Sequence, residues 1–302
     1  MAERVVIAIP TFKRPKSLAR LLDAIARLAT DAEISVLVAD NDAEAHQGFD
    51  LCAKLAPAYR WTLHAVIAEK RGIAQVRNCL VAEALKSDAD FIAMIDDDEW
   101  PEPRWIGEFL KTQKQTGADV LQGSVLFVHH QPGPGPVPDI RHPTGLTDML
   151  QGAGNLLIRR HVLEEIPPPW FDPAFALSGG EDRDFFMRLK QAGYRFGWAD
   201  EARALGEVAT ERRNLGWVMR RAYSNGNSDM RVLLKHRPGP MLMVRESLKI
   251  SAALLLSLPL ALILGASPNH RRAPLIKLCR AAGKLTAMAG ARYNEYAVVH
   301  GE

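Results

Sequence analysis

The feature that most constrains the fold is an apolar run that ends in a row of acids. Phe91–Ile95 are five apolar residues, which is typical of a buried strand. Four carboxylates follow without a break at Asp96–Glu99, and Pro101 and Pro103 then interrupt regular structure. Ligands of open α/β sheets bind at the carboxyl ends of strands, and carboxylates suit Mg²⁺ or Mn²⁺ with a diphosphate. A solvated acidic turn is the alternative interpretation.

The rest of the chain repeats this plan of a strand followed by a helix. Apolar runs predict further strands at 5–10, 34–39, 61–67, 119–128 and within 152–158. Helical spacing predicts helices at 16–29, 47–56, 73–85, 104–116, 160–165 and 181–192. This alternation predicts an α/β fold with a doubly wound, Rossmann-like and mostly parallel sheet. Ligand chemistry should then collect in the loops after strands, at 10–14, 40–42, 70–78 and 96–99.

A second acidic cluster opens a predicted helix. Gly179 and Gly180 precede Glu181 and Asp182 there. Glycines give this turn a flexible backbone, and the start of a helix exposes N–H groups. The alternative is that these acids only complement the helix dipole.

Five motifs together resemble a known family. They are Ile9–Arg14, Val38–Asn41, Arg71–Asn78, Ile95–Glu99 and Gly179–Asp182. They occur in the order found in family 2 glycosyltransferases, and the chain resembles the bacterial exopolysaccharide (succinoglycan-type) members over about residues 4–225. The resemblance implies a GT-A fold, a nucleotide-sugar donor, a divalent metal, Mn²⁺ or Mg²⁺, and inversion at the anomeric carbon.

The resemblance also assigns donor binding to particular residues. These are Pro10, Thr11, Arg14, Asp40, Gly72, Arg77, Asp96 and Asp97. Asp40 would accept a hydrogen bond from a uracil ring, with a helix cap as its alternative role. Gly72 would permit close backbone approach, and Arg77 would supply a forked donor or else be a surface helix residue.

The resemblance assigns the metal ligands to the first acidic cluster and the catalytic base to the second. Asp96 and Asp98 match the family's two metal-site acids, with Asp98 expected as the direct ligand. Asp97 is expected to point to the opposite face of an extended chain. Asp182 matches the family's base, which deprotonates an acceptor hydroxyl, and Glu181 is the neighbour most easily confused with it. The metal would offset charge on the leaving diphosphate.

Three more residues are candidates near the substrates. Arg212 and Arg213 belong to a basic cluster suited to a diphosphate or an anionic lipid, although charged helix faces are usually only solvated. Trp170 could stack on an acceptor sugar, with packing in the core as the alternative.

The C-terminal third departs from the pattern of a soluble enzyme. Residues 250–269 contain no charge, which is marginal for spanning a bilayer. Basic residues flank the run on both sides: Lys249, Arg271, Arg272, Lys277, Arg280 and Lys284. This pattern favours a segment that dips into the cytoplasmic leaflet, with a core helix or an oligomer contact as the alternative. We therefore expect a GT-A domain at 1–230 and a helical, membrane-associating region at 231–302, at the cytoplasmic face of the inner membrane.

These patterns predict one activity and leave two alternatives. We expect an inverting, metal-dependent glycosyltransferase that moves a sugar from a UDP donor to a lipid-linked saccharide or polysaccharide. The net charge of +3 argues against nucleic acid as a partner. A non-catalytic sugar-nucleotide-binding or scaffold subunit is one alternative. A haloacid-dehalogenase-like phosphatase is disfavoured, because it needs Thr or Val where this chain has Trp100.

Overall fold

The strands and helices follow one another largely as the sequence predicts. The computed structural model describes residues 2–128, 139–207, 214–263 and 272–294. The strands are β1 (Arg4–Thr11), β2 (Glu33–Asp40), β3 (Thr62–Ile67), β4 (Phe91–Met94), β5 (Glu99–Pro101), β6 (Val120–Val128), β7 (Gly145–Thr147), β8 (Leu156–Arg159) and β9 (Phe196–Glu207). The α-helices are α1 (Pro15–Ala26), α2 (Gln47–Leu55), α3 (Ile73–Ala84), α4 (Trp105–Thr116), α5 (Arg160–Glu165), α6 (Glu181–Gln191), α7 (Leu215–Lys235), α8 (Pro240–Ile263) and α9 (Arg272–Met288).

All the described strands join one mixed sheet. Its order is β3-β2-β1-β4-β8-β6-β9-β5, and β7 pairs with the side of β9. The neighbours β3, β2, β1 and β4 run parallel, while β8 is antiparallel to both β4 and β6. The predicted doubly wound, mostly parallel arrangement is therefore confirmed for the first half of the sheet. The prediction omitted β5, β7 and β9.

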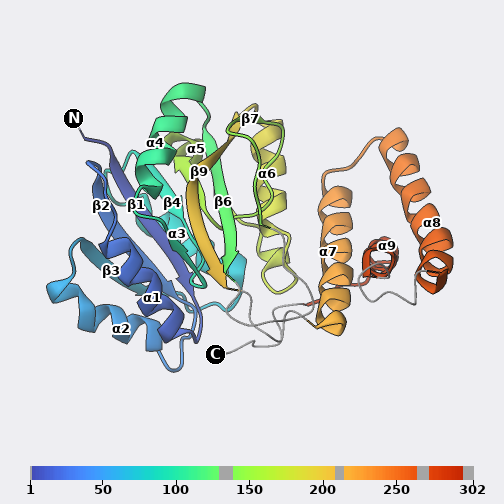
Figure 1. Cartoon of the computed structure of the whole chain (residues 1–302), viewed down its shortest axis with the longest axis horizontal. Coiled ribbons are helices and arrows are strands. Elements are labelled where there is room, and N and C mark those ends of the chain that lie inside the picture. Colours follow the sequence, from blue (N-terminus) through green and yellow to red (C-terminus); the bar gives the residue numbers. More distant parts are fainter. Residues whose placement is uncertain (1, 129–138, 208–213, 264–271, 295–302) are drawn as a thin grey trace.

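Helices cover both faces of the sheet, because its strands carry apolar side chains on both sides. In β1, Val6 and Ala8 face a core that includes Leu80 of α3 and Phe185 of α6. Alternate residues of the same strand, such as Ile7, face the core formed with α1, α2 and α4. Figure 1 shows the two helical layers on either side of the sheet.

The parallel pairing brings three strand ends to one edge of the sheet. Thr11 lies opposite Asp40 in the β1–β2 register, and the last β1–β4 pair is Ala8 with Met94. The acids that follow β4 therefore leave the sheet beside the loop after β1. Pro10 lies beyond that last pair, so its missing N–H removes no ladder bond with β4.

The last three helices form a separate layer beside α6. Asn214 caps α7 by accepting a hydrogen bond from the N–H of Trp217 (2.7 Å). α7 and α9 cross closely, because a Cβ on Gly226 would lie 2.0 Å from the carbonyl oxygen of Arg280. The predicted boundary between residues 230 and 231 falls inside α7, and the division into two units stays a prediction.

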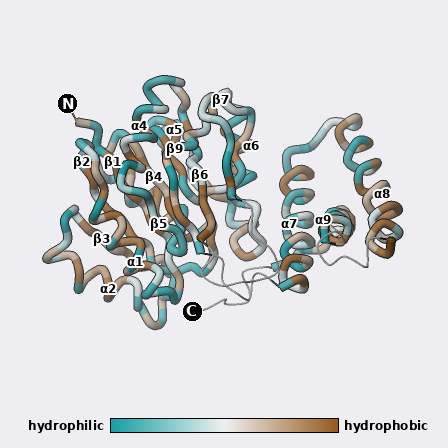
Figure 2. Tube along the Cα trace, viewed as in Figure 1, coloured by the Kyte–Doolittle hydropathy of each residue, from teal (hydrophilic) through white to brown (hydrophobic). Residues whose placement is uncertain are grey.

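The predicted apolar segment at 250–269 forms the second half of a longer helix, and its residues 264–269 lie outside the described residues. The helix α8 starts at Pro240, and its described part ends at Ile263 with Pro259 inside it. Figure 2 shows hydrophobic residues along α8, which lies on the far side of α7 from the sheet. Within the described residues, α8 is the one helix that is long and apolar enough to cross a membrane by length and composition.

Candidate functional site

The acids after β4 turn sharply instead of continuing as an extended chain. The N–H of Glu99 bonds to the carbonyl of Asp96 at 3.1 Å, which closes the turn. The Asp97 carboxylate accepts hydrogen bonds from Thr11 Oγ1 (2.8 Å) and Arg14 (3.1 Å), and Asp98 accepts one from the same Arg14 nitrogen (3.0 Å). The expectation that Asp97 points away from Asp98 is therefore wrong, because the turn directs both side chains to Arg14.

Arg77 joins the two acidic clusters. It lies on α3, is almost completely buried, and donates to Asp96 Oδ1 at 3.1 Å and to Glu181 Oε1. The alternative that Arg77 is a surface helix residue is thereby excluded. One guanidinium thus holds the end of β4 beside the start of α6, although these segments are far apart in sequence.

The crowding of acids changes their protonation. Burial, together with the charge of Asp98, raises the pKa of Asp97 to about 7 against the lowering effect of Arg14. Burial and the charge of Asp182 raise the pKa of Glu181 to about 7, although Arg77 lowers it. Desolvation and the charge of Asp98 also raise the pKa of Asp96, although Arg77 lowers it. Removal of water is the main cause in each case, so a cation at this edge would favour the ionised forms.

Glu99 is a member of the first cluster to which the sequence analysis gave no role. Its Oε2 is buried and has no hydrogen-bond donor among the described residues. Burial and the charges of Asp96 and Asp98 raise the pKa of Glu99 well above its usual value. Its position within the acidic run was the available signal, but the pattern could not distinguish its buried oxygen from the exposed ones.

A glycine-containing loop lies between the two clusters. A Cβ on Gly154 would lie 3.1 Å from Asp96 Oδ2 and 3.2 Å from Glu99 Oε1, and a Cβ on Gly152 would lie 3.6 Å from Asp182 Oδ2. Asn155 fixes this loop with a left-handed backbone (φ 50°) and a fully buried amide. That amide bonds to Trp105 Nε1, Ser124 O and Ala202 O at 2.6 to 3.0 Å. The loop therefore brings its backbone close to Asp96, Glu99 and Asp182 and presents no side chain to them at Gly152 and Gly154.

Asp182 occupies the first turn of α6. Its side chain is half-buried, and Oδ1 accepts a bond from the N–H of Arg183 at 2.7 Å. Its Oδ2 has no hydrogen-bond donor in the part of the chain that the structure describes, and it lies beside the glycine loop. Of the two neighbouring acids, Glu181 is the buried partner of Arg77, and Asp182 is the one with solvent access.

Asp40 performs the capping role that the sequence analysis gave as its alternative. It is fully buried, and its carboxylate accepts N–H bonds from Gly48 (2.8 Å) and Phe49 (3.0 Å) at the start of α2 and from Asp42 (3.0 Å). Recognition of the uracil ring by Asp40 stays a prediction. The geometry does not favour it, because the carboxylate already accepts these three N–H bonds. The neighbouring Asp42 is also buried, and its Oδ2 has no donor among the described residues.

Gly72 is required by contact between two loops. Its φ is +128°, and a Cβ there would lie 2.7 Å from the Cβ of Ala176. Its N–H donates to Asn41 Oδ1 at 2.8 Å, and the next N–H, from Ile73, bonds to Ala176 O at 3.1 Å. The glycine therefore joins the 70–73 loop to the segment before α6, and its role in donor binding stays a prediction.

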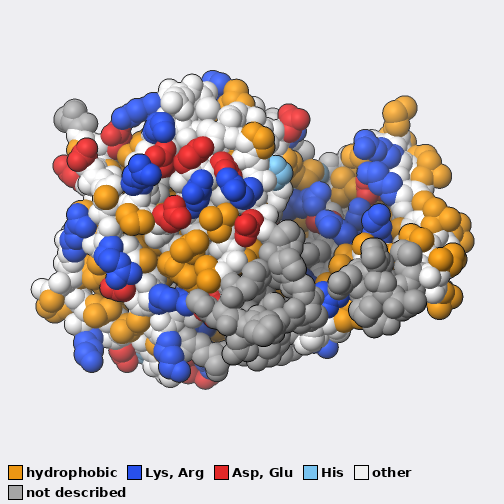
Figure 3. All heavy atoms as spheres, in the orientation of Figure 1, with side chains coloured by type: hydrophobic (Ala, Val, Ile, Leu, Met, Phe, Trp, Pro, Cys, Tyr) orange, Lys and Arg blue, Asp and Glu red, His pale blue; other side chains and the backbone are white. Residues whose placement is uncertain are grey.

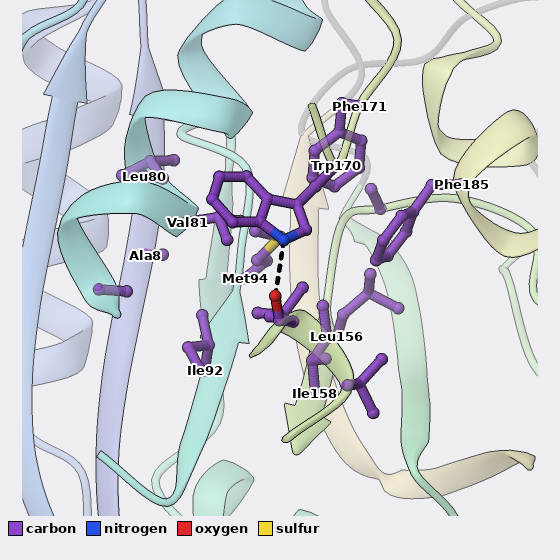
Figure 4. Close-up of a cluster of buried hydrophobic side chains, with 14 of the residues drawn as sticks. Ala8, Leu80, Val81, Ile92, Met94, Leu156, Ile158, Trp170, Phe171 and Phe185 are labelled. Carbon is purple, nitrogen blue, oxygen red and sulfur yellow. Dashed lines mark hydrogen bonds between the residues drawn. The ribbon is translucent and has the colours of Figure 1, made fainter. Parts of the chain in front are cut away.

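Trp170 has the core-packing role that was the alternative to stacking on a sugar. The ring packs in the core near Val81 and Met94, and its Nε1 donates to Leu163 O at 2.8 Å (Figure 4). Only a small part of the ring reaches a groove of about 560 Å³ between α3 and residues 168–173. The other two candidates near the substrates, Arg212 and Arg213, lie outside the described residues.

Comparisons with known proteins agree with this architecture. The sequence model described as Glycosyl transferase family 2 matches residues 6–165, which is more than half of the chain. The succinoglycan biosynthesis protein ExoM of Rhizobium meliloti is 29% identical over 241 residues, which cover 77% of this chain and 76% of that protein. The glycosyltransferase AglE of Haloferax volcanii is 23% identical over 70% of this chain and 71% of its own length.

Solved structures share the fold at low sequence identity. S. aureus TarS 1-349 in complex with UDP-GlcNAc is 15% identical, with a TM-score of 0.55 over 96% of this chain and 93% of that one. The chain spans 55% of the longer TarS structure. The mannosyltransferase PcManGT of Pyrobaculum calidifontis, in complex with GDP-Man and Mn²⁺, is 15% identical, with a TM-score of 0.65 over 95% of this chain and 88% of that one. The chain therefore belongs to glycosyl transferase family 2 and is a glycosyltransferase with the GT-A fold.

Proposed function

We propose that the protein transfers a sugar, with inversion, from a UDP donor to a lipid-linked saccharide or a polysaccharide. One observation carries the proposal: Arg77 holds Asp96 at the end of β4 and Glu181 at the start of α6 together. In this proposal, the expected diphosphate-binding and proton-accepting acids lie close together, and Gly152 and Gly154 beside them carry no side chain. The kinship with a succinoglycan biosynthesis protein supports a saccharide acceptor.

In this proposal, Asp182 is the general base. Its half-buried carboxylate takes the proton of the acceptor hydroxyl while that oxygen bonds to the anomeric carbon. The bond from the anomeric carbon to the diphosphate breaks in the same step, and UDP leaves with the electron pair. Arg14 lies beside Asp97 and Asp98, just after the C-terminal end of β1, where its guanidinium can attract the diphosphate. Pro10 and Thr11 would line the nucleotide pocket beside it.

The carboxylates fit a divalent cation whose remaining coordination positions are filled by the substrate's phosphates. Asp96 and Asp98 are each about one-third exposed and offer only oxygen donors, as Mg²⁺ and Mn²⁺ prefer. No group of three His, Cys, Asp or Glu in the described ranges is arranged to hold a metal ion. We therefore expect Asp98, assisted by Asp96, to hold a cation only together with the donor's phosphates. The bound metal would offset charge on the leaving diphosphate.

Ligand-dependent stability tests the donor and the metal together. UDP, UDP-GlcNAc, GDP and GDP-mannose are each added with Mn²⁺ or with EDTA, and the melting temperature is measured. A ligand at a hundredfold excess over its Kd stabilises by about 2.7 kcal/mol. We expect a shift with the uridine nucleotides and Mn²⁺, which Asp98→Asn abolishes and Asp50→Asn, an exposed control on α2, retains. Equal shifts in EDTA would contradict the metal, and a preference for GDP would contradict the UDP donor.

We also propose that α8 attaches the enzyme to the cytoplasmic face of the inner membrane. Large apolar side chains of this helix face solvent, including Leu255 (73% exposed) and Leu262 (74%). Figure 3 shows hydrophobic atoms gathered over α8 with basic groups towards the sheet domain. Part of the expected basic flank is neutralised internally, because Lys249 and Lys284 both pair with Glu246 at 2.6 to 2.7 Å. The apolar face is thus the stronger support for attachment.

A further inference from the structure

Helix α7 contacts the segment that carries the proposed base. This segment, residues 172–184, runs from the loop before α6 into its first turn. The Ser228 hydroxyl donates to the carbonyl of Ser178 at 3.0 Å in a buried contact. Arg231, one turn further along α7, donates to Ser178 Oγ at 2.6 Å and to Ala174 O at 2.9 Å. Its guanidinium also lies 4.8 Å from the centre of the Phe175 ring.

The contact is close enough to fix the backbone of the turn. Gly180 has a φ of +98°, and a Cβ on it would lie 3.1 Å from Ser228 Cβ and 3.4 Å from Val232. The turn therefore has its tight, glycine-dependent shape against the surface of α7. Asp182 follows two residues later, so its position depends on that shape.

The end of α7 holds the other side of the same segment. Asp184 is fully buried, and its Oδ1 contacts Lys235 Nζ (2.6 Å) and His236 Nε2 (3.0 Å). Lys235 also pairs with Asp172 at 2.7 Å. These contacts bracket Asp182, with Ser178 on one side of it and Asp184 on the other.

A third contact extends the connection to α9. Asp229 on α7 pairs with Arg183, the residue after the proposed base, and with Arg280 of α9, both at 2.5 Å. One carboxylate thus joins α6, α7 and α9. The C-terminal helices are connected to the neighbour of the proposed base through a single charged residue.

We infer that Arg231 and Ser228 of α7 are positioning residues for the general base. They hold the 178–182 turn so that Asp182 faces the open space beside Gly152. This inference rests on the proposed function, because it assumes that Asp182 is the base. It also assigns the C-terminal helices a role in turnover in addition to attachment.

Hydrogen exchange of the full chain tests the holding step without any substrate. We expect Arg231→Met to speed the exchange of amides in 175–184 by about tenfold, with the amides of β1 and β4 unchanged. Arg231→Lys keeps the charge and should give an intermediate rate, Ser228→Ala should give a smaller increase, and the exposed Arg220→Met on the same helix should give none. Unchanged exchange in Arg231→Met, or faster exchange throughout the sheet, would overturn the inference.

A double-mutant cycle tests whether the effect passes through Asp182. Release of UDP is measured from an equimolar mixture of UDP-glucose, UDP-galactose and UDP-GlcNAc, and UDP affinity is measured by calorimetry. We expect Arg231→Met to lower kcat ~10- to 100-fold with UDP affinity within about twofold. In the Asp182→Asn background, the same change should have almost no further effect. Full additivity would overturn the positioning role, whereas an active Asp182→Asn would instead refute the proposed base.

Discussion

The sheet domain and the C-terminal helices differ in which residues they bury. The sheet domain buries apolar and some charged side chains, whereas the C-terminal helices expose large apolar ones. In the sheet domain, β1 is buried along nearly its whole length, and buried charges such as Arg77 and Glu181 gather at one edge. In the helical region, the buried cluster is small, with Met230, Ile250, Ala281 and Ala287, while α8 exposes large apolar side chains. The first region therefore has a large core, and the second has a small core and an exposed apolar surface.

This difference shows where each kind of function can be located. Buried acids with a raised pKa cost stability and mark a site of chemistry. An exposed apolar helix costs little in the folded state and marks a contact surface. The family match ends at residue 165, so α6 and β9 of the sheet domain lie beyond it, as do the C-terminal helices. The two regions meet where α7 contacts the 172–184 segment.

The largest effect is expected from replacing Arg77, the side chain that pairs with both acidic clusters. Arg77→Met leaves the buried Glu181 and the neighbouring Asp96 without it, which should cost about 3–5 kcal/mol in urea unfolding. The control Arg27→Met breaks a pair with Asp23 whose side chains are 63% and 64% exposed, and should cost under about 1 kcal/mol. Equal losses of stability in the two variants would mean that the buried ion pairs of Arg77 contribute no more than an exposed pair.

A smaller loss should follow from separating α7 and α9. A Cβ on Gly226 would lie 2.0 Å from a backbone oxygen of α9, which cannot move as a side chain could. Gly226→Ala should therefore destabilise the helical region by about 1–3 kcal/mol, seen as faster hydrogen exchange in α7 and α9 but not in β1. Gly107→Ala on α4, with nothing within 4 Å of the new Cβ, is the control. Uniformly faster exchange would show that the two regions unfold as one unit.

The raised pKa of Glu181 predicts a pH-dependent effect. Its folded value of about 7 exceeds the ordinary value of 4.5, so the folded state binds the proton more tightly. The stability that Glu181 contributes is thus fully present below pH 4.5 and is lost as pH rises through 7. The melting temperature of the wild type should fall relative to that of Glu181→Gln between pH 4.5 and 7. The difference between the two melting temperatures should be constant above pH 8. A constant gap over the whole range would contradict the raised pKa.

The smallest effect on stability is expected on α8. Replacing Leu255 and Leu262 together by Ser should change the free energy of unfolding by no more than about 0.5 kcal/mol per site, because both side chains are exposed. The same variant should lose binding to phosphatidylglycerol vesicles in a flotation assay. Leu146→Ser, at an exposed position on β7, is the control and should keep it. A large loss of stability would mean that α8 belongs to a core.

Much of the sheet domain could be predicted because local patterns specify it. The strands at 5–10 and 34–39 are continuous apolar runs, and their pairing as parallel neighbours follows from the one helix between them. β9 could not be found in this way, because Asp200, Glu201 and Arg203 interrupt its apolar residues. The antiparallel insertion of β8 depends on contacts between distant segments that no local pattern records.

The site could be predicted in its members but not in their connections. The two acidic clusters were visible in the sequence, yet the single arginine that joins them lies 19 residues from one acid and 104 from the other. The capping by Asp40 was open as an alternative until the start of α2 was placed beside it. The contacts from Ser228 and Arg231 had no signal in the sequence, because a serine and an arginine on a helix are ordinary surface residues.

The central claim is that the space between Asp96 and Asp182 is the catalytic centre and that Asp182 accepts the proton. The most direct measurement is kcat for UDP release by Asp182→Asn, with donor Kd measured in parallel. The change keeps the shape of the side chain and removes the proton acceptor. The account predicts that kcat falls by ~10² to 10⁴ while donor Kd stays within about twofold. Near-normal turnover in Asp182→Asn, with turnover lost in Glu181→Gln, would contradict it and assign the base to Glu181.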